Sequence, residues 1–357
     1  MPQVSRPLAK RAVENPAPPP GSDMQSRFVR SFADRVRGLR LSGGIQSWGP
    51  TAALLLLCVV FSILSPRFRT IENLQNVGDA ASILMVVSVG LTFVLLMGAI
   101  DLSVEGVIAA TALTTALTAA NTRNENDFGL FAVVFAIAAG AGFGLFNGLA
   151  NTRLRVPSFM ATLGMSSIGL GVATVLYGGQ SPAIMDMAIG SWALDKWLGF
   201  SRLTFVAVAV AGAGYLIQRY TRLGRYAYVI GGGEDVARLS GIKIDRYKVL
   251  LFMLAGGLFG LAGAMCAARL EAGVVDAGAG MQFAGITAVV IGGTLLSGGR
   301  GGVLHTIVGV LILTVLQDGM VLVGVSPYVL TALQAILIVA AVVATGWPLR
   351  RRMRVIK

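Results

Sequence analysis

The sequence predicts an all-α polytopic membrane protein with about ten transmembrane helices. Hydrophobic residues make up 55% of the chain and charged residues only 13%, whereas a soluble domain carries about 25% charged residues. Long apolar runs alternate with short polar segments; a transmembrane barrel would instead show segments of about 10 residues with alternating polarity. Basic residues gather in tails and loops, which signals membrane orientation and not nucleic-acid binding.

Ten apolar runs account for the predicted spans, because a transmembrane helix needs about 20 residues, or about 17 at the short end. The runs at 203–217 and 281–296 are short, and the turn at Asp101 is tight. Residues 47–346 form the predicted membrane domain, between a disordered polar tail at 1–46 and a basic tail at 347–357. We expect spans at 48–64, 78–100, 102–120, 128–150, 157–177, 203–217, 249–268, 281–296, 302–323 and 328–346.

Charge predicts the orientation of these spans. Ten spans place both tails and the loop 218–248 on one side of the membrane, together with 23 of the 29 lysines and arginines. The positive-inside rule makes that side cytoplasmic, so both termini are expected there. The largest loop on the other side is 178–202, where Trp192 and Trp197 suit an interfacial helix.

The basic loop is the only long segment in the interior of the chain that is both polar and basic, and it holds seven lysines and arginines between Arg219 and Lys248. The glycines 231–233, followed by Glu234 and Asp235, predict the start of a short helix, because helix N-termini favour negative charge. We expect this helix to dock on a soluble partner; the alternative is a solvated loop that serves topology and lipid head groups. The predicted docking residues are Glu234, Asp235, Val236, Ala237, Arg238, Leu239, Ser240 and Gly241.

Few polar side chains fall inside the predicted spans, and such groups are costly in a membrane and commonly functional. Most are uncharged amides and hydroxyls, which suit a neutral hydroxylated solute better than an ion, although hydroxyls also bond back to helix carbonyls. For Asp101, capping of the third span from a cytoplasmic turn is the simpler interpretation. The predicted solute path consists of Asp101, Ser103, Asn147, Phe159, Thr162, Gln282 and Thr287.

No catalytic, metal-binding or cofactor-binding chemistry is predicted. The single histidine, His305, cannot assemble a metal site, and the two cysteines, Cys58 and Cys266, lie in apolar runs where they act as small hydrophobic residues. The sequence contains no G-x-x-x-x-G-K-[ST] phosphate-binding loop, so any energy from ATP would come from a partner.

Glycines recur at four-residue spacing in two predicted spans. One set is Gly140, Gly144 and Gly148, and the other is Gly256 and Gly260. Small residues on one helix face allow backbones to approach closely in lipid. Packing within the chain is the simpler explanation for both sets, and a homodimer interface is the alternative.

Five stretches in order connect the chain to a known family. They are L-T-F-V-L-L-M-G-A-I-D-L-S-V at 91–104, F-N-G-L-A-N-T-R-L-R-V-P-S-F-M-A-T-L-G-M at 146–165, T-R-L-G-R-Y at 221–226, A-R-L-S-G-I at 237–242 and I-T-A-V-V-I-G-G-T-L-L-S-G-G-R-G at 286–301. On these stretches, the chain resembles the permease subunits of bacterial ribose-type sugar ABC importers, including ribose, xylose, arabinose and galactose permeases.

The resemblance implies a permease without enzymatic activity in the bacterial inner membrane. It further implies cytoplasmic ATP-binding subunits, a periplasmic solute-binding protein, and a second permease copy, which is either identical or a paralogue. In this family, a short cytoplasmic helix couples the permease to the ATPase, and residues 234–241 stand at that place. Membrane lipid is the other expected partner.

The chain departs from the family pattern near the expected path. Ala99 and Glu105 stand where glycines are usual, and Gln282 and Ala284 stand where two acidic residues are common. The expected solute is a sugar or polyol, with a nucleoside or a furanosyl signalling molecule as the alternative. A secondary transporter would call for buried ionisable residues and a repeat between halves, and an embedded enzyme would call for a nucleophile, base or metal cluster.

Overall fold

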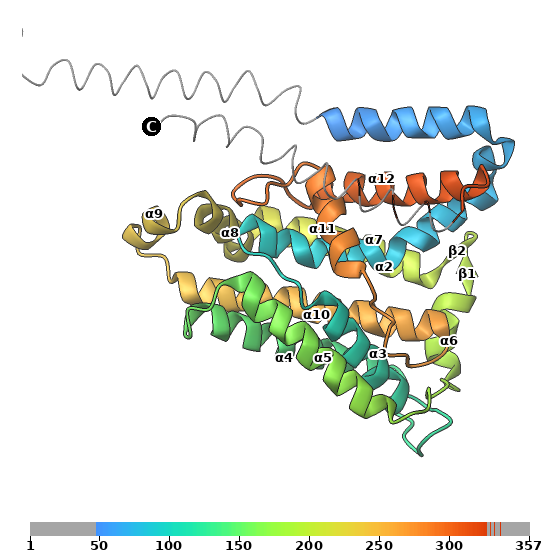
Figure 1. The fold of residues 1–357 in the computed structure, drawn as a ribbon, viewed down its shortest axis with the longest axis horizontal. Helices are drawn as coiled ribbons and strands as arrows, with labels where there is room; N and C mark the ends of the chain where they lie inside the picture. The colour runs from blue at the N-terminus through green and yellow to red at the C-terminus, as the bar shows by residue number, and fades with distance from the viewer. Residues whose placement is uncertain (1–47, 327–328, 330–331, 333–335, 337–357) are drawn as a thin grey trace, which may run out of the picture. The chain divides into compact units, whose positions relative to one another are not determined.

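The computed structural model describes residues 48–326 together with residues 329, 332 and 336. The chain divides into the units Met1–Trp48 and Gly49–Lys357, and almost all described residues belong to the second. Helices dominate this unit (Figure 1). In chain order they are Trp48–Leu64, the 3-10 turn η1 (Pro66–Arg69), α2 (Ile71–Leu96), α3 (Val104–Thr118), α4 (Phe131–Thr152), α5 (Ser158–Tyr177), α6 (Met187–Leu194), α7 (Arg202–Tyr220), α8 (Arg222–Gly232), α9 (Glu234–Leu239), α10 (Ile244–Leu270), α11 (Met281–Ile291) and α12 (Val303–Leu322).

The all-α polytopic class is confirmed. Six helices are long and apolar enough to cross a membrane: α2, α4, α5, α7, α10 and α12. Three shorter apolar helices, Trp48–Leu64, α3 and α11, match three further predicted spans. The span predicted at 281–296 is wrong at its end, because α11 stops at Ile291 and Gly293 adopts a φ of 112°. The predicted span 328–346 and both tails lie outside the described residues, apart from residues 329, 332 and 336.

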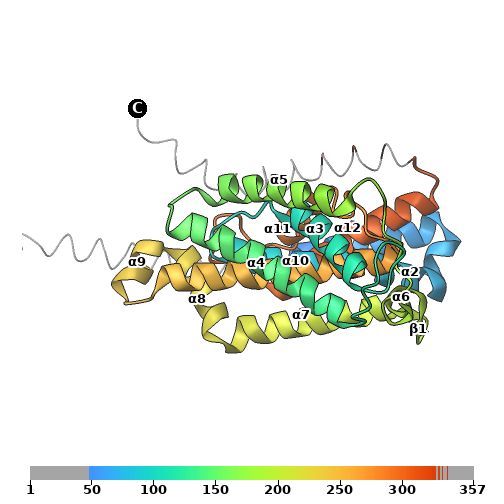
Figure 2. The same ribbon diagram turned by 90° about the horizontal axis from the view of Figure 1, so that it is seen from below.

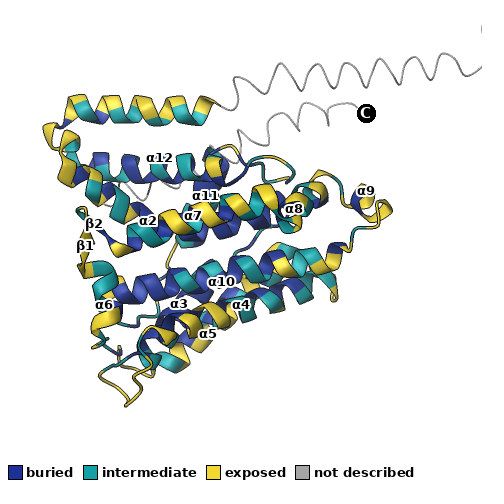
Figure 3. Cartoon of the chain, turned by 180° about the vertical axis from the view of Figure 1, so that it is seen from behind, coloured by how far each residue is buried: buried dark blue, intermediate teal, exposed yellow. Residues whose placement is uncertain are grey.

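Helix α2 is the centre of the described fold. It packs against α7, α10, α11 and α12, and most of its side chains from Ile83 to Leu96 are buried. The long helix α10 adds the fully buried rings of Phe252 and Phe259. Figure 3 shows α10 largely buried and α5 largely exposed, and Figure 2 shows α5 and α7 on opposite sides of α10. The scaffold is therefore built around α2 and α10.

Glycines set the close packing of α4 against α10. A Cβ atom built on Gly140 would collide with the carbonyl oxygen of Gly256 and the backbone of Gly260. A Cβ on Gly144 would meet the backbone of Phe252, and one on Gly256 would meet Gly140 and Gly144. Both glycine sets therefore mediate packing within the chain, as the simpler interpretation predicted, because only a residue without Cβ allows the two backbones to touch.

The loop 178–202 differs from the predicted interfacial helix. Only α6 is helical there, and the Asp186 carboxylate caps it by accepting from the amide of Ala188 at 2.8 Å. Trp192 lies in α6 and packs against the core. Trp197 lies instead in the antiparallel hairpin of β1 (Lys196–Trp197) and β2 (Phe200–Ser201). Helix α6 ends at Leu194, because Asp195 is extended. Leu198 and Gly199 adopt positive φ values and form the two-residue turn of the hairpin.

Candidate functional site

The turn between α2 and α3 is buried, although it is not helical. After Leu96 the chain leaves the helix, Gly98 adopts a φ of 79°, and α3 begins only at Val104. The Asp101 side chain is fully buried, and its Oδ1 accepts from the Ser103 amide at 2.8 Å and from the Ser103 hydroxyl at 2.6 Å. Asp101 therefore holds Ser103, the residue that precedes α3, but it does not cap the helix as the simpler interpretation expected, because its carboxylate accepts from Ser103 and not from the first amides of α3.

Helices α4 and α5 hold this turn through polar side chains. The Asn147 amide donates from Nδ2 to the Ser103 hydroxyl at 2.9 Å. The Thr162 hydroxyl accepts from the Leu102 amide at 2.9 Å, and the Ser158 hydroxyl accepts from the Ile100 amide at 3.1 Å. The structure thus brings together Asp101, Ser103, Asn147 and Thr162 from the predicted set. Sequence reasoning missed Ser158, although its place directly after Pro157 at a helix start was a usable signal.

A second polar contact joins α3 to α11. Gln282 donates from Nε2 to the Glu105 carboxylate oxygen Oε2 at 2.7 Å. Glu105 and Gln282 both stand at positions where the chain departs from the family pattern, and the structure pairs them. The other two predicted residues make no such link: Thr287 donates to the carbonyl of Phe283 within its own helix, at 2.7 Å, and the Phe159 ring on α5 is 45% exposed.

Three predicted path residues carry buried oxygen atoms that have no hydrogen-bond partner in the described part of the chain. These atoms are Oδ2 of Asp101, Oδ1 of Asn147 and Oε1 of Gln282. Buried polar atoms in folded proteins are nearly always hydrogen-bonded, so each such exception calls for an explanation. All three atoms accept hydrogen bonds, so they match a ligand or waters that donate.

The predicted docking segment is a short helix, α9, followed by Ser240 and by Gly241 with a φ of 77°. Its apolar side chains point away from the fold, since Val236 is 67% exposed and Leu239 is 90% exposed. Glu234 pairs with Lys248 at 2.7 Å and with Arg238 at 3.5 Å. Ala237 is buried and anchors the helix.

The basic loop contains a second helix that the sequence reasoning missed. Helix α8 begins after Thr221, whose hydroxyl accepts from the Gly224 amide at 3.3 Å, and it buries Ala227 and Ile230. The apolar spacing of Leu223, Ala227 and Ile230 was the available signal. Of the glycines 231–233 that were expected to lead into the short helix, the first two belong to α8, and only Gly233 separates α8 from α9.

The end of α8 packs directly against the buried turn. A Cβ on Gly231 would collide with the carbonyl of Leu96 and the amide of Gly299, and that amide donates to the Leu96 carbonyl at 3.0 Å. The Tyr228 hydroxyl of α8 donates to the carbonyl of Gly301 at 2.7 Å. The docking segment is therefore connected through backbone contacts to the turn that carries Asp101.

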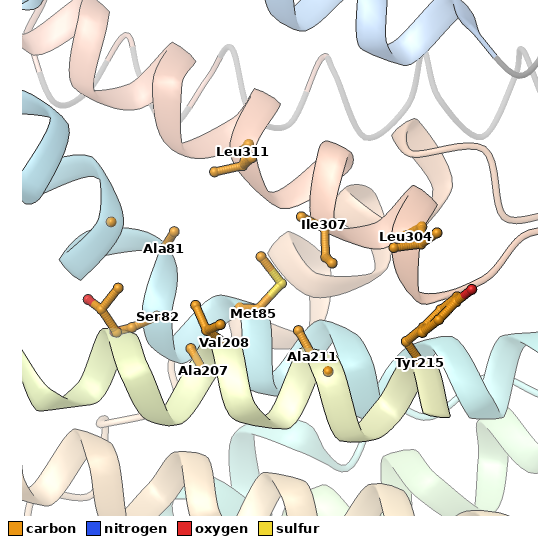
Figure 4. Close-up of a pocket in the computed structure, with 13 residues that line it drawn as sticks. Ala81, Ser82, Met85, Ala207, Val208, Ala211, Tyr215, Leu304, Ile307 and Leu311 are labelled. Atoms are coloured by element: carbon orange, nitrogen blue, oxygen red, sulfur yellow. The ribbon is translucent and has the colours of Figure 1, made fainter. Parts of the chain in front are cut away.

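A cavity of about 470 Å³ lies elsewhere, between α2, α7 and α12 (Figure 4). Its walls are almost entirely apolar. The hydroxyls of Ser82 and Thr204 are already used, since they donate to the carbonyl and the carboxylate of Asp79 at 2.7 and 2.6 Å. The cavity therefore suits hydrocarbon better than a hydroxylated solute, and it contains none of the predicted path residues. It is lined by Gly78, Ala81, Ser82, Met85, Thr204, Ala207, Val208, Ala211, Gly212, Tyr215, Leu304, Ile307 and Leu311.

Comparison with known proteins identifies the family. Residues 73–342 match the family described as branched-chain amino acid transport system / permease component. The ribose import permease RbsC of Escherichia coli K12 is 38% identical over 295 residues, covering 81% of this chain and 90% of the relative. RbsC of Bacillus subtilis is 34% identical over 306 residues, covering 85% and 94%. The L-arabinose transport system permease AraH of E. coli K12 is 30% identical over 303 residues, covering 83% and 90%.

No solved structure is significantly similar to the chain. The family match spans most of the residues that form the described helices, including α2 to α12 almost completely. The chain is therefore a multi-pass membrane permease, and it belongs to the family of transport-system permease components that includes these ribose and arabinose import permeases.

Proposed function

We propose that the chain is the membrane subunit of an ATP-binding cassette importer that moves a sugar or polyol. The observation that carries this proposal is the group of buried, unpartnered oxygen atoms on Asp101, Asn147 and Gln282 in the described part of the chain. A solute rich in hydroxyl donors would satisfy these acceptors when the path opens. The ribose and arabinose import permeases among the relatives support the same class of solute.

An amino acid is the competing solute, because the family description names branched-chain amino acids. An amino acid carries a carboxylate, which calls for a cationic partner when it is desolvated. The charged groups near the proposed path are instead the carboxylates of Asp101 and Glu105, and no ion pair among the described residues includes either. A neutral solute fits this charge distribution better.

Uptake by the complete transporter tests the proposal. The permease, its ATP-binding subunits and its solute-binding protein are reconstituted in liposomes, and ATP-dependent uptake of radiolabelled ribose, arabinose, uridine and leucine is measured. We expect pentose uptake, which Asn147→Leu lowers at least ten-fold while the complex still assembles. Asn76→Leu, an exposed asparagine on α2, is the matched control. Transport of leucine in place of a pentose would overturn the proposed solute class, and uridine transport would establish the nucleoside alternative.

The ATP-binding subunits are proposed to dock on α9. Exposed Val236 and Leu239 would be buried in the partner, while Glu234, which is tied to Lys248 and Arg238, would keep the helix in place. Leu239→Asp should abolish capture of the ATPase, because a carboxylate at the contact must be desolvated. Leu154→Asp, at another exposed leucine in the loop after α4, should have no effect. Equal capture by both variants would remove α9 as the docking element.

The orientation is proposed with α9 in the cytoplasm and α6 on the periplasmic side, where a solute-binding protein would meet the permease. The charge distribution supports this orientation, since 23 of 29 basic residues fall on the side of α9. In a variant without Cys58 and Cys266, a thiol reagent that cannot cross the membrane should label Met187→Cys in intact cells. Ser240→Cys should react only after lysis. The opposite labelling pattern would invert the topology.

A second permease copy is proposed to pack against the outer face of α5. Gly164 and Gly171 have no described atom within 4 Å of a built Cβ, and Leu163, Ile168 and Val175 are exposed beside them. Helices in lipid associate through small residues that allow close approach. The inner face of α5 is already occupied, because Gly169 lies against Gly106 of α3.

A further inference from the structure

Glu105 is a carboxylate in an unusual place for a membrane helix. It lies in the first turn of the apolar helix α3, where the helix N-terminus favours negative charge, and its side chain is only half-buried. Ionisable groups within membrane segments are rare and face the bundle interior or a water-filled path. Among the described residues, no lysine or arginine forms an ion pair with it.

The neighbouring Gln282 side chain is oriented by this carboxylate. Its Nε2 donates to Glu105 Oε2 at 2.7 Å, which directs the amide oxygen Oε1 away from Glu105. Gln282 is 9% exposed, and Oε1 has no partner in the part of the chain that the structure describes. The hydrogen bond between Glu105 and Gln282 therefore fixes the direction of the Gln282 oxygen Oε1. Burying this unsatisfied oxygen costs free energy of folding.

A third polar group, from α2, approaches α11 about one helical turn after Gln282. The Ser88 hydroxyl of α2 is fully buried and has no hydrogen-bond partner among the described residues. It faces α11 at Gly285, since a Cβ built on that glycine would lie 3.7 Å from Ser88 Oγ. Gly285 is three residues after Gln282 and therefore on the same helix face. Helix α11 thus lies between Ser88 of α2 and Glu105 of α3. Leu91 and Val87 of α2 approach Gly285 more closely than Ser88 does.

We propose that Glu105, Gln282 and Ser88 form one subsite of the proposed solute path, with Glu105 as its specificity-determining residue. The subsite takes adjacent hydroxyl groups of a neutral polyol: the carboxylate and the Gln282 carbonyl accept from them, and the Ser88 hydroxyl donates or accepts. A solute carboxylate is repelled by Glu105. This inference rests on the proposed function and deepens it, since it assigns a residue that chooses hydroxyl-bearing solutes.

The experiment uses the complete reconstituted transporter with radiolabelled ribose as the probe. Glu105→Gln retains a hydrogen bond to Gln282 but removes the charge, and we expect initial ribose uptake to fall at least ten-fold with the complex still assembled. The exchange Glu105→Gln with Gln282→Glu returns one carboxylate to the pair and should recover at least half of the uptake. Glu72→Gln, at an exposed carboxylate in the first turn of α2, is the control and should leave uptake unchanged.

The variant Ser88→Ala tests whether the Ser88 hydroxyl contacts the solute or serves only the fold. The hydroxyl has no partner to lose in the described fold, so a purely structural role predicts unchanged or higher thermal stability and unchanged uptake. We expect unchanged stability with at least three-fold slower ribose uptake. Wild-type uptake by Glu105→Gln, or an exchange variant no better than Glu105→Gln, overturns the subsite while the proposed function stands. Leucine uptake in place of pentose uptake by the unaltered transporter overturns both.

Discussion

The glycines of α4 and α10 and those on the outer face of α5 have opposite surroundings. Gly144 and Gly256 lie against the backbone of a neighbouring helix, so neither position has room for a methyl group. Gly164 and Gly171 face no described atom within 4 Å. Both sets are small residues in apolar helices, so their composition is the same. The difference indicates that the first set builds the fold and that the second is free to meet another molecule.

The largest expected effect is a loss of stability on substitution of the glycines packed between α4 and α10. Gly144→Ala places a methyl group against the backbone of Phe252, and overpacking of this kind costs about 1–3 kcal/mol or more. We expect a clear drop in thermal stability in detergent and poor yield of the folded protein. Gly142→Ala, on the same helix with no described atom within 4 Å, should be neutral or slightly stabilising. Equal stability of the two variants would mean that the α4–α10 contact is looser than described.

Two adjacent glycines of α8 allow a sharper version of the same comparison. Gly231 touches Leu96 and Gly299, whereas Gly232 has no described atom within 4 Å. We expect Gly231→Ala to lower solute uptake per ATP hydrolysed several-fold, because the methyl group separates α8 from the turn that carries Asp101. Gly232→Ala should resemble the wild type. The measurement is uptake and ATP hydrolysis on the same liposomes.

If Gly231→Ala kept the wild-type ratio of uptake to hydrolysis, the contact between α8 and the turn would serve stability alone. Capture of the ATPase provides the control, since α9 and its exposed Val236 and Leu239 are unchanged in this variant. A loss of capture in Gly231→Ala would show that the substitution disturbs docking itself.

A smaller effect, on the association of two copies, is expected at the glycines on the outer face of α5. Gly171→Leu should leave the stability of the single chain unchanged and weaken association of two copies about ten-fold, which corresponds to about 1.4 kcal/mol. The proportion of dimer in lipid nanodiscs, measured by single-molecule photobleaching, reports this change. Gly142→Leu is the matched control, at a glycine of α4 that no described atom approaches within 4 Å. Loss of dimer in the control but not in Gly171→Leu would move the interface from α5 to α4.

The smallest effect is expected at the charged surface of α9. Arg238 and Glu234 form an exposed i, i+4 ion pair at 3.5 Å, and such pairs contribute about 0.3–0.5 kcal/mol. Arg238→Gln should therefore change thermal stability by less than 1 °C. The apolar contact of Leu239 should instead dominate ATPase capture. A stronger loss of capture in Arg238→Gln than in Leu239→Asp would assign the docking energy to charge.

The sequence by itself determined the class of protein and which nine apolar runs of the described part are helical, although the ends of α2 and α11 differ from those predicted. Composition and run length are sufficient for this, because lipid forces backbone groups to pair within each helix. The buried polar residues Asp101, Asn147 and Gln282 were also recognisable, since polar side chains are conspicuous in apolar runs. Both findings depend on local pattern alone.

Only the tertiary structure decided which of these groups meet and which glycines are enclosed. Glu105 and Gln282 are 177 residues apart in the chain, and no local pattern pairs them. Gly231 and Gly232 are adjacent glycines that no sequence pattern distinguishes, yet only Gly231 contacts the buried turn. The physical reason is that burial and contact depend on how helices are placed in three dimensions, which side-chain packing over the whole fold determines.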